Sequence, residues 1–96
     1  MIPKSVTIAG IDIDIVWADL GDDRCLGRAE YKEQKIYINP KLSAEDIRNQ
    51  CYHHELLHSI FFIMGRHDLR EDEVFIDSLA HLLYQARKSE VKREEE

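Results

Sequence analysis

Several features that mark common protein classes are scarce or absent in this 96-residue sequence. Two cysteines, Cys25 and Cys51, are too few for a disulfide framework, so we expect both to be thiols. No apolar run is long enough to span a bilayer, and the first residues lack the apolar core of a signal peptide. The sequence therefore predicts a cytoplasmic protein without a membrane partner.

Basic residues are outnumbered by acidic ones: the sequence has 13 Lys and Arg against 19 Asp and Glu, which gives a net charge of −6. A nucleic-acid-binding surface is normally basic, so we expect no nucleic-acid partner. The length suits one small domain with a marginal core, to whose folding a bound metal would contribute. We expect this domain to span residues 1–88, followed by a charged tail over residues 89–96.

The first forty residues have the periodicity of strands. Residues 5–8 and 11–17 flank an Ala-Gly turn signal, and the second of these segments alternates apolar with acidic residues. Residues 28–31 and 35–38 form another predicted hairpin, which an Asn-Pro pair ends. The sequence therefore predicts a small, antiparallel-rich sheet of about three to four strands.

The remainder predicts two main helices. Ser43 is a candidate N-cap for the first, which continues without Gly or Pro to Met64 and ends at Gly65. After a short connection, residues 71–88 form the second helix. The residues that we expect it to contribute to the core are Val74, Phe75, Leu79, Leu82 and Leu83. A small sheet followed by two helices gives an α+β fold class.

The run His54-Glu55-Leu56-Leu57-His58 is an H-E-x-x-H motif within the first predicted helix. Residues four apart share a helix face, so both imidazoles can bind one Zn²⁺ while Glu55 acts on a metal-bound water. Zn²⁺ lowers the pKa of that water to about 7 and polarises a carbonyl. Glu55 then accepts the water proton and passes it to the leaving amine. The predicted reaction is hydrolysis of a peptide or amide bond.

A catalytic zinc ion needs a third protein ligand and an open position. Glu73, on the second predicted helix, is our preferred third ligand. Asp77, one turn later, is placed to accept the outer N–H of a ligand histidine and fix its tautomer. His67 is an alternative third ligand, a candidate for stabilising an oxyanion, or simply a loop histidine in water.

The motif residues together resemble a known group. H-E-x-x-H followed on the next helix by Glu73-Val74-Phe75-Ile76-Asp77-Ser78-Leu79-Ala80 is similar to the E-x-x-[AI]-[ND]-x-[FL]-A pattern of ImmA/IrrE-type zinc metallopeptidases. Small phage and prophage proteins resemble nearly all of residues 5–88. The matching positions include Lys35-Ile36-Tyr37-Ile38, Gly65, Asp72, Leu79-Ala80 and Tyr84-Gln85.

This resemblance implies a minimal zincin fold with one Zn²⁺ held by His54, His58 and Glu73, and Glu55 as catalytic base. It also implies a protein or peptide substrate and, for a phage-encoded chain, action in the host cytoplasm. Members of the wider group cleave transcriptional repressors, but they are longer or carry further domains. A non-catalytic zinc-binding adaptor and a helical core with a chance motif are the alternative interpretations.

Overall fold

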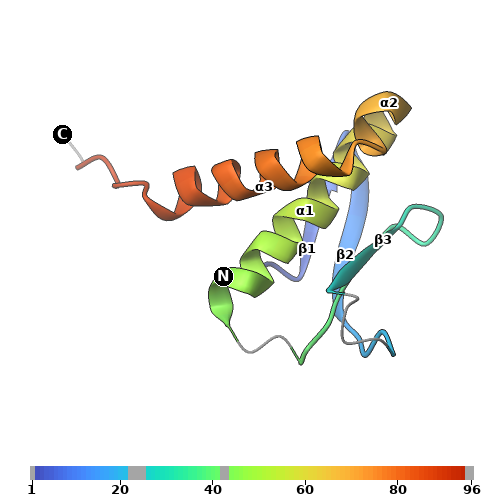
Figure 1. Cartoon of the computed structure of the whole chain (residues 1–96), viewed down its shortest axis with the longest axis horizontal. Coiled ribbons are helices and arrows are strands. Elements are labelled where there is room, and N and C mark those ends of the chain that lie inside the picture. Colours follow the sequence, from blue (N-terminus) through green and yellow to red (C-terminus); the bar gives the residue numbers. More distant parts are fainter. Residues whose placement is uncertain (1, 22–25, 42–43, 95–96) are drawn as a thin grey trace.

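The computed structural model describes residues 2–21, 26–41 and 44–94. These residues form a four-stranded sheet followed by helices, which confirms the predicted α+β class (Figure 1). The strands are β1 (Ser5–Ile8), β2 (Ile11–Trp17), β3 (Gly27–Glu30) and β4 (Lys35–Ile38). The helices are α1 (Glu45–Met64), α2 (His67–Arg70) and α3 (Glu73–Lys88).

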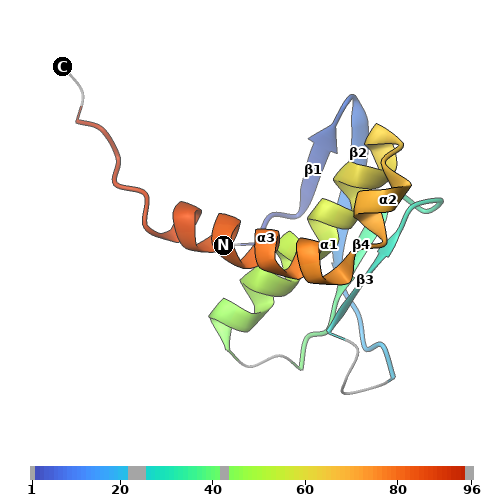
Figure 2. The ribbon, with the colours of Figure 1, turned by 45° about the horizontal axis from the view of Figure 1, so that its top comes forward.

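The sheet has the strand order β1-β2-β4-β3. Both predicted hairpins are present as antiparallel pairs. The hairpins join through a parallel pairing of β2 with β4, in which Ile15 lies opposite Ile36, so the sheet is mixed. This order leaves β3 at one edge of the sheet, beside α1 (Figure 2).

Helix α1 lies between the sheet and α3, and it buries side chains on both sides (Figures 1 and 2). One cluster joins α1 to the sheet and consists of Ile13, Ile15, Ile36, Ile38, Cys51 and Tyr52. The other joins α1 to α3 and consists of Leu57, Phe61, Ile76 and Ala80. Because α1 is packed from two sides, it is a rigid support for any site built on it.

The predicted core of the second helix is partly wrong. Val74, Phe75 and Leu82 are 79%, 37% and 61% exposed, whereas Ile76 and Ala80 are fully buried. Helix α3 packs mainly along α1, and its C-terminal half extends away from the sheet, so it buries only a narrow stripe (Figure 1). Apolar residues outside that stripe therefore face the solvent.

The helix ends agree with the sequence in part. Gly65 ends α1 as predicted: it adopts a left-handed conformation with φ of 73° and donates its N–H to the Phe62 carbonyl. Ser43, the candidate N-cap, lies outside the described residues. Helix α3 begins two residues later than predicted, where the Asp72 carboxylate caps it by accepting the N–H of Phe75.

Two further segments lie next to the main helices, one between them and one after α3. The predicted connection between the main helices contains the short helix α2. Residues 89–94 form neither helix nor strand and are exposed. None of the helices in the described part of the chain is long and apolar enough to cross a membrane.

Candidate metal centre

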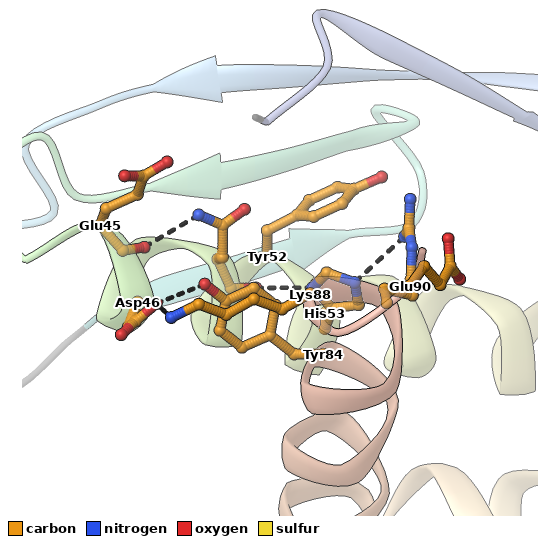
Figure 3. A pocket seen from close by; sticks show the side chains of 9 residues that line it. Glu45, Asp46, Tyr52, His53, Tyr84, Lys88 and Glu90 are labelled. Atoms are coloured by element: carbon orange, nitrogen blue, oxygen red, sulfur yellow. Dashed lines mark hydrogen bonds and ion pairs between the residues drawn. The ribbon is translucent and has the colours of Figure 1, made fainter. Parts of the chain in front are cut away.

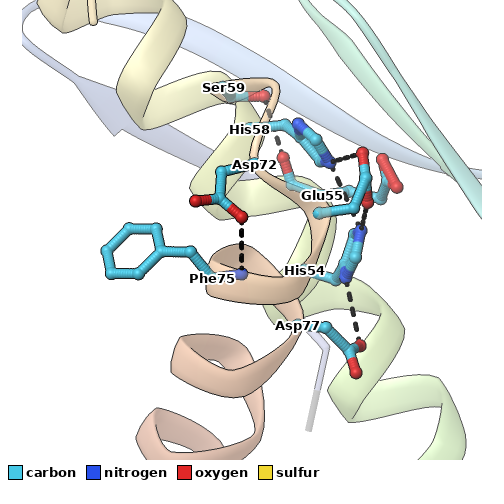
Figure 4. A network of polar contacts seen from close by, with 8 residues as sticks. His54, Glu55, His58, Ser59, Asp72, Phe75 and Asp77 are labelled. Atoms are coloured by element: carbon cyan, nitrogen blue, oxygen red, sulfur yellow. Dashed lines mark hydrogen bonds and ion pairs between the residues drawn. The ribbon is translucent and has the colours of Figure 1, made fainter. Parts of the chain in front are cut away.

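Helix α1 brings the two motif histidines together. His54 and His58 lie one turn apart and their rings extend toward the start of α3 (Figure 4). Their Nε2 atoms are 3.3 Å apart. Both side chains are mostly buried, 22% exposed at His54 and 12% at His58, so water covers only part of each ring.

Glu73, the first residue of α3, completes the group. Its Oε2 lies 3.1 Å from Nε2 of His54, and its Oε1 lies 3.1 Å from Nε2 of His58. The donor atoms of the three residues all lie within 4.8 Å of one another. Ligands of a tetrahedral zinc ion with bonds of about 2.0–2.1 Å are about 3.3 Å apart. The three side chains therefore have the chemistry and the spacing of a zinc-binding set.

The outer side of each ring also has a polar neighbour. Asp77 places Oδ1 3.4 Å from Nδ1 of His54 (Figure 4), and its orienting role stays a prediction. His58 interacts with the backbone of Arg70, in α2. Burial nevertheless lowers the pKa of His58, which favours the neutral imidazole that binds metals. Both rings thus turn Nε2 toward Glu73.

Glu55 is held on a different side of α1, against the edge strand. It is only 9% exposed, and burial raises the pKa of its carboxyl to about 7. His54 lowers this pKa and the negative charge of Glu73 raises it, while a backbone hydrogen bond from Ala29 of β3 lowers it. A carboxyl that titrates near neutrality is suited to accept and then release a proton.

A cluster that the sequence did not reveal lies close to the centre. Tyr31, in the turn that follows β3, stacks on Phe62 with ring centres 4.3 Å apart. The Arg70 guanidinium carbon is 5.4 Å and 5.6 Å from these two centres, so it lies beside the rims of both rings rather than over one face. Burial raises the pKa of Tyr31, the charge of Arg70 and a hydrogen bond with it lower this pKa, and Glu55 and Glu73 raise it by smaller amounts. The Tyr31 hydroxyl therefore shares the electrostatic surroundings of the centre.

His67 is the alternative candidate for the third ligand. His67 is exposed at the start of α2 and does not belong to the group formed by His54, His58 and Glu73. The structure therefore brings Glu73, rather than His67, to the two motif histidines.

His53 points away from the centre, into a separate pocket of about 320 Å³ between α1 and α3 (Figure 3). Its Nδ1 donates to the carbonyl of Asn49 at 2.7 Å, so its Nε2 accepts from Arg87. Burial lowers the pKa of His53, which keeps it in this neutral form. The Nδ1 contact lies within α1 and the Nε2 contact joins α1 to α3, so both ring nitrogens have structural roles.

No protein-family model, curated protein or solved structure matches this chain. The resemblance to ImmA/IrrE-type metallopeptidases therefore stays a prediction that rests on the motif residues. Of the two cysteines, Cys51 is buried in the sheet–α1 core and forms no disulfide bond among the described residues. Cys25 lies outside them.

Proposed function

We propose that this protein is a cytoplasmic, zinc-dependent peptide hydrolase of the ImmA/IrrE type. In this proposal His54, His58 and Glu73 hold one Zn²⁺ and Glu55 is the catalytic base. The observation that carries the proposal is the convergence of two imidazole nitrogens and a carboxylate within 4.8 Å, next to a buried carboxyl. Two histidines, a third ligand and an adjacent glutamate are the parts of a zinc peptidase site.

The chain's own residues have separable roles in peptide hydrolysis. Bound Zn²⁺ supplies Lewis acidity, which polarises a carbonyl and makes water more acidic. Glu55 accepts a water proton on its carboxylate and passes it to the leaving amine. Asp77 holds the outer nitrogen of His54, so that Nε2 stays turned toward Glu73.

Two further observations favour catalysis over a zinc-binding adaptor. Among the described residues the group contains three ligands, whereas a structural zinc site normally has four. In addition, no strand of the described chain pairs with the outer edge of β3, beside Glu55. An extended peptide is able to hydrogen-bond to such an edge, apart from the Ala29 N–H, which already donates to Glu55.

The test compares metal content with cleavage. Natively purified wild-type protein should contain about one zinc ion per chain, and it should cleave members of a proteome-derived peptide library, read by mass spectrometry. His54→Ala should lose the zinc. Glu55→Gln should keep the zinc and lose cleavage. Glu71→Gln, a matched change at an exposed glutamate, should keep both.

Two results would contradict the proposal. Cleavage that survives in Glu55→Gln would exclude Glu55 as the base. Stoichiometric zinc in a wild-type protein that cleaves no peptide would favour the adaptor. Because Cys25 lies outside the described residues, Cys25→Ser belongs in the same series, and it should retain both zinc and cleavage.

A further inference from the structure

A cavity of about 620 Å³ opens directly beside the candidate metal centre. One part of its lining is the site itself, namely His54, Glu55 and Asp77. The volume falls within the range of about 300–1,000 Å³ typical of small-ligand sites. Whatever occupies this cavity lies next to the proposed base, so the rest of the lining determines what can bind there.

The rest of the lining is largely apolar. Leu26 and Ile47 line the cavity from two segments, the entry to β3 and the first turn of α1. Both are large hydrophobic side chains, yet they are 42% and 48% exposed. Cys51, 7% exposed, adds a further apolar surface.

Gly27 lines this cavity where β3 lies close against α1. A side-chain carbon at this position would lie 2.6 Å from Sγ of Cys51 and 3.1 Å from Cγ of Glu55. The absence of a side chain therefore lets β3 approach α1 closely, with the apolar surface and the Glu55 carboxyl in one cavity.

The charges around the cavity restrict its occupant further. Among the residues that the structure describes, the polar part of the lining consists of His54, the neutral Gln50 and the carboxyl groups of Glu55 and Asp77, and it includes no Lys or Arg. An acidic side chain would meet like charge there, and burying it would cost its hydration. An aliphatic or aromatic side chain would instead remove the exposed surfaces of Leu26 and Ile47 from water.

We propose that this cavity, the Leu26–Ile47 pocket, binds a bulky apolar side chain of the peptide substrate adjacent to the bond that is cut. The assignment rests on the proposed function, and it narrows the substrate class to peptides with an aliphatic or aromatic residue at that position. Leu26 and Ile47 are specificity-determining residues, and Gly27 is a positioning residue.

The test uses two short peptide hydroxamates that are identical except for one side chain, isobutyl in one and hydrogen in the other. Their affinities for the zinc-loaded protein are measured by isothermal titration calorimetry. The isobutyl compound should bind the wild type at least about tenfold more tightly, because burying a leucine-sized side chain contributes on this scale. In Ile47→Gln the ratio should fall to about threefold or less.

Leu82→Gln is the matched control, because Leu82 is 61% exposed on α3 and does not line this pocket. It should keep the wild-type ratio. A second readout locates the binding: the isobutyl compound should shift the methyl NMR resonances of Leu26 and Ile47, and the hydrogen compound should shift them less.

The outcomes separate the two proposals. Equal binding of the two hydroxamates, or a ratio that Ile47→Gln leaves unchanged, would refute the pocket and leave the zinc site intact. Failure of the zinc-loaded protein to bind either compound would refute the proposed function, and the pocket assignment with it.

Discussion

Gly27→Ala is the sharpest perturbation of the contact that places Glu55. The added methyl carbon would lie 2.6 Å from Sγ of Cys51, 3.0 Å from the carbonyl oxygen of Tyr37 and 3.1 Å from Cγ of Glu55. Non-bonded carbon atoms prefer separations of about 3.5–4.0 Å, so β3 or α1 must move by about 1 Å. Overpacking of this kind costs about 1–3 kcal/mol. For a domain of this size, each kcal/mol lowers Tm by about 4–8 °C.

A double-mutant cycle identifies the cause. Cys51→Ala removes the nearest clashing atom, so the Gly27→Ala/Cys51→Ala pair should show a favourable coupling of about 1 kcal/mol in urea denaturation. Gly10→Ala is the control, since a methyl group there meets nothing within 4 Å. Its effect should simply add to that of Cys51→Ala. A Gly27→Ala variant as stable as the wild type, or a cycle without coupling, would refute the close approach of β3 to α1.

Three further predictions test the burial of Ile76, the contact of Asp77 with His54, and the pair that Asp46 of α1 forms with Lys88 of α3. Ile76→Ala should lower the free energy of unfolding, measured by urea titration, by about 2–5 kcal/mol, because Ile76 is fully buried. Val74→Ala is the control: Val74 is 79% exposed, so the free energy of unfolding should change by less than about 0.5 kcal/mol. Asp77→Asn should weaken zinc binding by about 10–100-fold in a competition assay while Tm of the metal-free protein stays unchanged, and an unaltered affinity would contradict its orienting role. A hydrogen bond from Lys88 lowers the pKa of Asp46, so this pair stabilises the fold above the ordinary carboxyl pKa and the gain is lost as pH falls through the lowered value. Wild type should therefore exceed Asp46→Asn in Tm at pH 6, and the difference should shrink as pH falls below the ordinary carboxyl pKa; a constant difference would exclude the linkage.

Local sequence signals predict this fold well where neighbouring residues determine the structure. The β1–β2 hairpin and the end of α1 at Gly65 follow from turn and capping chemistry within a few residues. The parallel pairing of β2 with β4 does not follow from such local signals, because it joins segments from two hairpins and depends on packing against α1. The short helix α2 was missed for a similar reason, since four residues carry too little periodicity.

The candidate site likewise contains some residues that local sequence signals predict and others that they do not. The shared face of His54 and His58 follows from helical periodicity alone, and the place of Glu73 follows from two helices packed side by side. Arg70 and Tyr31 gave no such signal. Each comes from a connecting segment whose path is determined by tertiary contacts, so nothing nearby in the sequence indicates that it lies near the centre.

The burial of Glu55 supports its proposed role as the catalytic base. Burial raises its pKa to about 7, which means that the fold disfavours the ionised carboxylate. An apolar or amide side chain of similar size would avoid this cost. Metal binding does not require Glu55 either, because the three converging donor atoms belong to other residues. The proposed reaction gives Glu55 a role, since a base that first accepts and then donates a proton is best served by a pKa near neutrality.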